Sequence, residues 1–167
     1  MTIIKAKYKS EDNNWVSLTF SDGSVGQVST TDGIRRQYTD MYNDYVAKGG
    51  TVEPMHSLAD LQAKKIQELE KAYSNANQLD IAYMNTTFQA DKKSQDLIVS
   101  VLSAGNVPSG FFWVDKTNKQ VAMTYTDLQG LSSAILVRNQ ANFVHLQNLK
   151  GRVKATTAQA ELDAIIW

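Results

Sequence analysis

The spacing of apolar residues in this 167-residue chain changes near residue 34, and that change restricts the folds open to it. Over the first thirty residues apolar and polar side chains alternate, which is typical of strands with one solvent-exposed face. Ile4, Ala6 and Tyr8 are expected to share one face of the first strand. Asp22-Gly23 is a type I′ turn signal between the next two strands. The sequence therefore predicts a small antiparallel β-meander, which needs another element packed on it.

Helical spacing follows the meander. A first helix is predicted to stop at Gly49-Gly50, and residues 51–54 are expected to be extended because Pro54 disfavours helix in the residue before it. The apolar and aromatic positions that define this helix are Ile34, Tyr38, Met41, Tyr42 and Tyr45.

A second helix is predicted from Ser57 to about Asn77. Ser57 is expected to be its N-cap residue, and Asp60 is expected to complete a capping box with it. Its apolar stripe is narrow and its other face is charged, which indicates a partly exposed connector. We therefore divide the chain into an N-terminal docking module (1–56), a connector helix (57–80) and a C-terminal module (81–167).

The C-terminal module is predicted to be a small α+β unit, so the fold class of the whole chain is α+β. Its long helix is expected to be capped by Thr126 or Asp127 and to run to about Lys154, with Gly151 as a weak point. The other predicted elements are a strand over 81–88, a helix from Asp91 to before Gly105, a hairpin from 111–114 and 120–124, and a short helix starting at Thr157.

Apolar residues along the long helix form a narrow stripe of the coiled-coil kind, interrupted around Arg138 and Asn142. Two interpretations remain open. The helix packs on its own hairpin, or the stripe is a self-association seam in which Asn142 fixes the register. The stripe comprises Leu128, Leu131, Ile135, Asn142, Leu146, Leu149 and Val153.

Composition and motifs exclude several function classes. The chain has 17 basic and 17 acidic residues and no cysteine, which argues against a global nucleic-acid or anionic-lipid footprint and removes thiolate chemistry. His56 and His145 lie far apart without carboxylates at ligand spacing, and the acidic residues fall where turns and caps need them. Phosphate-binding loops and serine nucleophile elbows are absent. We therefore predict no catalytic, cofactor-binding or metal-binding residue, no membrane span, and no enzyme.

Several segments together resemble a known family. The passage SGFFWVDKTNKQVAMTYTDLQGL (109–131), the long helix and the ending ATTAQAELDAIIW (155–167) resemble a domain of unknown function found at the C-terminus of many small tail proteins of tailed bacteriophages. The segment FQADKKS (88–94) fits the same domain. Residues 37–54, QYTDMYNDYVAKGGTVEP, are similar to a segment of the same phage proteins. The sequence departs from the family at two positions: Gly151 interrupts a helix that the family usually fills with alanine, and Asn142 replaces a commoner small residue.

The resemblance implies a non-enzymatic structural protein of a phage tail, assembled in the host cytoplasm and located in the virion. It implies a small adaptor of the baseplate or tail-fibre apparatus whose partners are other tail or fibre proteins, with a homotrimer as the first oligomer to test. A tail-fibre assembly chaperone is the alternative, and a small enzyme acting on surface glycans is a third. Candidate partner contacts are Tyr38, Tyr42, Tyr45, Trp15 and Asn142.

The closing motif of the resembling domain also has a physical interpretation. A terminal helix that buries its large apolar groups would lock the C-terminus against the long helix, since each such group stabilises by about 1.5–3 kcal/mol. The residues expected to do so are Leu162, Ile165, Ile166 and Trp167.

Overall fold

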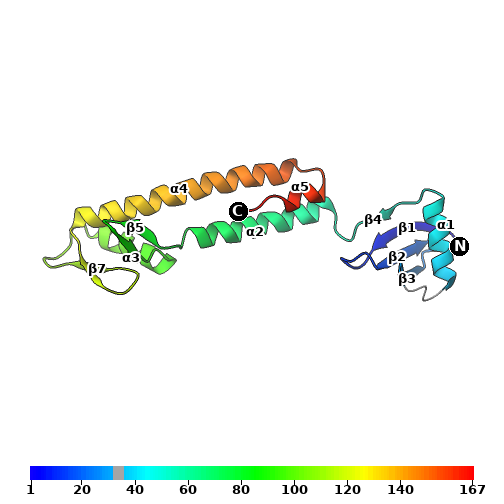
Figure 1. Cartoon of the computed structure of the whole chain (residues 1–167), viewed down its shortest axis with the longest axis horizontal. Coiled ribbons are helices and arrows are strands. Elements are labelled where there is room, and N and C mark those ends of the chain that lie inside the picture. Colours follow the sequence, from blue (N-terminus) through cyan, green and yellow to red (C-terminus); the bar gives the residue numbers. More distant parts are fainter. Residues whose placement is uncertain (32–35) are drawn as a thin grey trace. The chain divides into compact units, whose positions relative to one another are not determined.

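The computed structural model describes residues 1–31 and 36–167, and the chain divides into two compact units, Met1–Asp60 and Leu61–Trp167. Each unit combines helices with strands, which confirms the predicted α+β class (Figure 1). Ile34, the first position expected on the helical stripe, lies outside the described residues.

The first unit contains the predicted meander and one further strand. Strands β1 (Ile3–Tyr8), β2 (Trp15–Phe20) and β3 (Val25–Ser29) pair antiparallel. Strand β4 (Val52–Glu53) pairs parallel with β1, so the sheet order is β3-β2-β1-β4. The extended backbone before Pro54 was predicted, but its pairing with β1 was not.

Helix α1 (Arg36–Ala47) covers one face of this sheet and ends, as predicted, before Gly49. Three tyrosines of α1 pack with Met41 against the sheet core, and Gly49 closes the helix with φ +84°. Trp15 is the first residue of β2, precedes the buried Val16 and is 41% exposed. The buried core residues are Ala6, Val16, Leu18, Phe20 and Val28, and the three tyrosines are Tyr38, Tyr42 and Tyr45.

Two local predictions in the meander are wrong. Ile4 does not share the inner face with Ala6, because a β-bulge between Ile3 and Lys5 turns Ile4 outward, where it is 63% exposed. The β2–β3 loop is not a type I′ turn, since Gly23 alone has positive φ and its N–H donates to the Phe20 carbonyl (2.9 Å). This is a three-residue loop in which glycine takes the left-handed position.

Half of the second unit is an antiparallel helix pair. Helix α2 (Leu58–Ala76) begins with the predicted Ser57–Asp60 capping box, and helix α4 (Tyr125–Ala155) runs beside it (Figure 1). Helix α5 (Gln159–Asp163) packs into the same core. Residues 57–80 are therefore not a separate connector, because α2 contributes apolar side chains along its length to the second unit. That core contains Leu69, Leu146, Leu149, Val153, Leu162 and Ile165, with Leu61, Ile66 and Tyr73 against it.

The other half of the second unit packs two hairpins and a helix on the first part of α4. The hairpins are β5 (Ile81–Tyr83) with β6 (Thr86–Phe88), and β7 (Phe112–Val114) with β8 (Gln120–Ala122). Helix α3 (Lys92–Ser103) is capped by Asp91. Their core comprises Phe88, Ala90, Ile98, Trp113, Met123, Leu128, Leu131 and Ile135.

Residues 81–88 were predicted to form one strand, but they form a β-hairpin whose turn has two residues. Met84 and Asn85 both have positive φ (50° and 60°), as a type I′ turn requires. The Tyr83 side chain approaches α4 so closely that a Cβ atom at Gly130 would overlap its hydroxyl oxygen. Gly130 is therefore needed for this contact.

Both ends of the α4–α5 segment differ slightly from the prediction. Thr124, not Thr126 or Asp127, caps α4 in a reciprocal box with Asp127, and the helix passes through Gly151 to Ala155. Leu162 and Ile165 are buried as expected, but Ile166 is 74% exposed. Because α5 ends at Asp163, the next residues do not continue its apolar face.

Trp167 is also not buried, although it is in contact with the helix pair. Trp167 is 37% exposed, and its ring lies edge-on to those of Tyr73 and His145, with centroids 6.3 Å and 4.9 Å apart. The terminal tryptophan therefore packs on the surface of the α2–α4 pair and does not enter the core.

Candidate interaction surface

The apolar stripe predicted along α4 lies inside the chain. Its first half packs on the hairpins and α3, and its second half packs on α2 and α5. Of the two interpretations, the structure therefore shows the intramolecular one for this stripe. Any contact that α4 makes with a partner must use another of its faces.

Polar residues interrupt the stripe because they hold the end of α2. The Arg138 guanidinium donates to the carbonyl oxygens of Asn77 (2.6 Å) and Leu79, and burial lowers the pKa of Arg138. Asn142 donates to the Asn77 side chain (2.8 Å), and Gln95 donates to the Asn77 carbonyl (2.7 Å). Asn142, a candidate partner contact, is thus engaged within its own chain. The network caps the carbonyls of the segment just after α2, which ends at Ala76, and its cation lies near the negative end of the helix dipole.

Replacing Arg138 tests this network. We expect Arg138→Met to lower the free energy of unfolding by about 1.5–3 kcal/mol, because two carbonyls lose a charged donor while the aliphatic stem is kept. Chemical denaturation measures the change. Arg152→Met, an exposed cation on the same helix, is the control and should change the value by less than about 0.5 kcal/mol. Equal losses in both variants would contradict the capping role.

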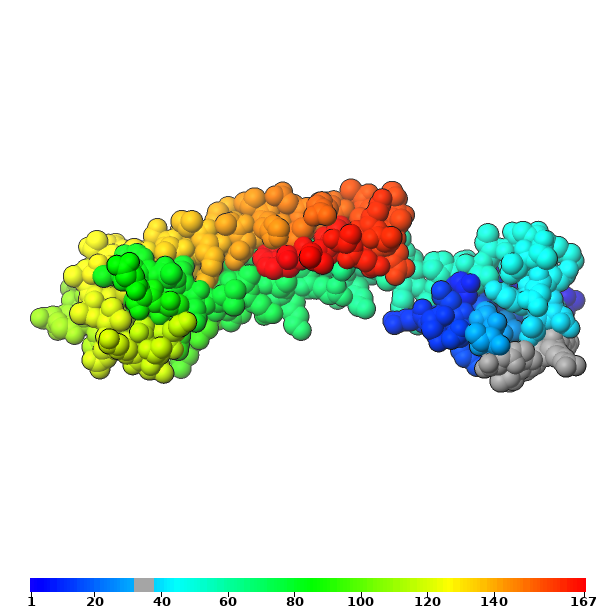
Figure 2. Space-filling view, viewed as in Figure 1, coloured from blue at the N-terminus to red at the C-terminus, as the bar shows by residue number. Residues whose placement is uncertain are grey.

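The middle of the outer face of α4, between Asp127 and Lys150, carries apolar side chains and no charge. Between Asp127 and Lys150 the only Lys, Arg, Asp or Glu is Arg138, which is committed to α2. Successive residues of a helix are rotated by about 100°, so the four exposed apolar residues lie together on the side opposite the core stripe. Figure 2 shows α4, yellow to orange, along one side of this unit. The four are Leu136 (67% exposed), Val137 (67%), Phe143 (45%) and Val144 (49%); we call them the outer α4 patch.

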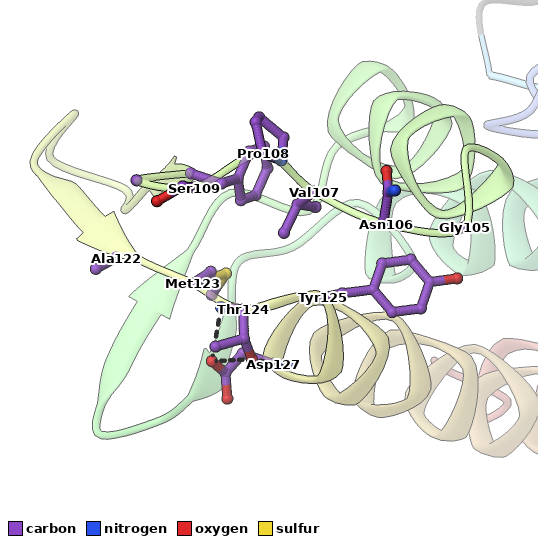
Figure 3. Close-up of a pocket in the computed structure, with 12 residues that line it drawn as sticks. Gly105, Asn106, Val107, Pro108, Ser109, Ala122, Met123, Thr124, Tyr125 and Asp127 are labelled. Carbon is purple, nitrogen blue, oxygen red and sulfur yellow. Dashed lines mark hydrogen bonds between the residues drawn. The ribbon is translucent and has the colours of Figure 1, made fainter.

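A pocket of about 520 Å³ lies beside the start of α4 (Figure 3). The loop from Gly105 to Phe111 forms one wall, and Ala122 to Tyr125 with Asp127 form the other. In Figure 3, Val107 points towards Met123 while Pro108 points away from it. The volume is in the range of small-molecule sites, so its polar groups decide what it could do.

Those polar groups are largely engaged in holding the fold. The Asp127 carboxylate accepts bonds from the Thr124 N–H (2.8 Å) and hydroxyl (2.7 Å), and the Tyr125 hydroxyl donates to the Leu102 carbonyl (3.0 Å). Asn106 and Ser109 are the remaining polar side chains, and both are exposed. The pocket therefore presents no convergent set of free polar groups.

Within residues 1–31 and 36–167, the carboxyl groups whose pKa values are shifted are all shifted downward. The Thr117 hydroxyl and then the Lys119 N–H lower the pKa of Asp115, and the Thr124 hydroxyl lowers that of Asp127. A general acid needs the opposite shift. Within residues 1–31 and 36–167, no group of three His, Asp or Glu residues could hold a metal ion.

These shifts predict how stability depends on pH. A carboxyl group whose pKa is lower in the folded chain stabilises the fold above its ordinary pKa of about 3.9 and loses that contribution as pH falls through the lower value. We therefore expect the free energy of unfolding to fall as the pH is lowered below about 4. Urea denaturation at several pH values measures it, and Thr117→Ala, which removes a donor to Asp115, should flatten the dependence. Stability rising on acidification would contradict the expectation.

The outer α4 patch is the site that periodicity did not reveal. The sequence carried one usable signal, the single charged residue over residues 128–149, which is unusual for a helix with a solvent-exposed face. His145 packs on Trp167 within the second unit, and His56 belongs to the first unit. No helix in the described part of the chain is both long enough and apolar enough to cross a membrane.

Comparison with known proteins places the chain in a family. The family model described as domain of unknown function DUF4376 matches residues 60–166, so the chain belongs to that family. The matched segment coincides closely with the second compact unit, Leu61–Trp167. No curated protein and no solved structure matches the chain.

Proposed function

We propose that the chain is a non-catalytic structural component of a bacteriophage tail, a small adaptor of the baseplate or tail-fibre apparatus. It would be assembled in the host cytoplasm and reside in the virion. The assignment to a phage tail is supported by the resemblance to phage tail proteins of residues 88–94, 109–131 and 155–167. The outer α4 patch supports the role, which is to make protein–protein contacts.

The outer α4 patch carries this proposal because its composition is that of an interface. The cores of protein–protein interfaces are depleted of charge and enriched in aromatic and apolar side chains. Four neighbouring side chains, 45–67% exposed, leave apolar area in water that a partner could cover. The capping carboxylates and the engaged pocket supply no comparable chemical site.

The first unit offers a second contact surface in the proposed adaptor. Trp15 is 41% exposed on β2, where the buried alternate residues point to the α1 side. Lys5 pairs with Glu53 (3.0 Å) on the neighbouring strand, while Lys7 and Lys9 form no ion pair within the described residues. We propose that this open face docks on a neighbouring tail or fibre protein.

An assembly chaperone for the tail fibre is the second candidate. The segment 37–54, which resembles that of proteins described in this way, forms α1 and β4 of the first unit. A compact unit of this kind could bind a fibre during folding and leave it afterwards.

Mass spectrometry of purified virions tests the proposal. The structural role predicts the chain in particles of the encoding phage at a fixed ratio to known tail proteins. Absence from particles, together with co-purification with the fibre protein from infected cells, would favour the chaperone. Absence from both would overturn the assignment to the tail apparatus.

A further inference from the structure

The outer α4 patch is symmetric about one residue. Leu136 and Val144 lie four residues on either side of Gln140, and Val137 and Phe143 lie three residues on either side. On a helix of about 3.6 residues per turn, Gln140 therefore points along the centre of the patch. Gln140 is also the midpoint of α4, which runs from Tyr125 to Ala155.

A two-fold axis through Gln140 would make this patch complementary to itself. In an antiparallel pair of helices, such an axis places Leu136 opposite Val144 of a second copy, and Val137 opposite Phe143. Because Gln140 is the midpoint of α4, the same axis would direct each end of one α4 helix towards the opposite end of the other. We propose that the chain forms a two-fold symmetric homodimer through the outer α4 patch. The inference rests on the contact role proposed above and assigns a second copy as the partner of that surface.

Electrostatics favours a second copy as the occupant. Isologous contacts place each surface against itself, so any charge on the axis would meet its own like charge. The outer face has no charged side chain between Asp127 and Lys150. At the axis, Gln140 brings an amide that both donates and accepts and can therefore bond to its own copy. Antiparallel α4 helices also oppose their dipoles.

The symmetry distinguishes this dimer from the homotrimer that the resemblance suggested. Around a three-fold axis the helices run parallel, and each residue meets its equivalents at the same height. The symmetry of the patch about Gln140 would then create no complementary contact. Four partly exposed apolar side chains per copy also fit a small interface, for which we expect a dissociation constant in roughly the 10–100 µM range.

Single-cysteine cross-linking tests the geometry directly, because the chain has no cysteine of its own. Gln140→Cys in the full chain should cross-link to itself in high yield with a short bis-maleimide. Gln129→Cys should not cross-link to itself, because the two copies of residue 129 would lie about 33 Å apart. In a mixture of the two variants, Gln129→Cys should cross-link to Gly151→Cys. Lys71→Cys, exposed on α2, is the background control. Self-cross-linking of Gln129→Cys as strong as that of Gln140→Cys would mean a parallel pair and would overturn the proposal.

Sedimentation equilibrium tests the dimer without modification. The unmodified chain should move from monomer to dimer with concentration, and Leu136→Lys should weaken the dimer at least about tenfold, because the lost contact occurs twice. Val99→Lys is the matched control, an exposed apolar residue on α3 (60% exposed) away from the patch, and should leave the dimer unchanged. A monomer up to about 500 µM, or a trimer, would overturn the proposal. If the chain is monomeric but is present in virions, the dimer proposal fails and the proposed tail function is unaffected.

Discussion

Replacing Phe88 with alanine is expected to lower the free energy of unfolding of the second unit by about 3–5 kcal/mol. Phe88 is fully buried at the end of β6 and belongs to the core shared with Ile98, Trp113 and Leu131. Removing the ring leaves a cavity between two hairpins and α4, which the short strands are poorly able to close. Urea denaturation followed by tryptophan fluorescence measures the loss.

Phe112→Ala is the matched control for Phe88→Ala. Phe112 lies in the second hairpin of the same unit but is 46% exposed on the face opposite Trp113. We expect its loss to cost under about 1 kcal/mol, because exposed positions contribute little. Similar losses in the two variants would mean that the core is not centred on Phe88.

The second large effect is at the C-terminus, where two adjacent isoleucines should behave differently. Ile165→Ala is expected to lower the free energy of unfolding by about 2–5 kcal/mol, since Ile165 is 2% exposed among the α2, α4 and α5 side chains. Ile166→Ala should change it by no more than about 0.5 kcal/mol, since Ile166 is 74% exposed. Thermal or chemical unfolding of the two variants measures both.

The same residues refine what a deletion would do. Removing residues 164–167 is expected to give an insoluble or molten product, chiefly through Ile165 and to a smaller extent through the Trp167 contacts with Tyr73 and His145. A truncated chain that still melts cooperatively at the same temperature would contradict the locking role. So would an Ile166 variant less stable than the Ile165 variant.

Long periodic elements were predictable from the sequence. Helix α2 begins at its predicted capping box, α3 at Asp91, and α4 spans nearly the predicted residues, because repeated apolar spacing over many turns outweighs local exceptions. The β1–β3 meander was predictable for the same reason. The strict alternation in β2 places Val16, Leu18 and Phe20 on the buried face.

Short and non-local features were not predictable. The pairing of β4 with β1 joins two residues to a strand more than forty positions earlier, and no local pattern encodes it. The bulge at Ile4 and the Met84-Asn85 turn depend on one or two backbone angles, which tertiary packing decides. Trp167 and Ile166 follow a helix too short to fix which side faces inward.

The candidate site was predictable only in part. Apolar spacing predicts the inner stripe of α4 and its interruption at Asn142, whereas the bond from Asn142 to Asn77 depends on the tertiary fold. The outer α4 patch does not follow from apolar periodicity, because the inner stripe alone already gives α4 the one buried face that the pattern predicts. Tyr38, Tyr42 and Tyr45 were candidates for partner contacts, and the structure places them against their own sheet.

Phage particles carrying patch variants test the central claim, that the outer face of α4 is a contact surface of a tail component. The measurement is the ratio of this chain to a known tail protein in purified virions, by quantitative mass spectrometry. We expect Leu136→Lys combined with Phe143→Lys to abolish incorporation, and Val99→Lys, on another exposed helix face, to leave it unchanged. Incorporation of the double variant at the wild-type ratio would contradict the account.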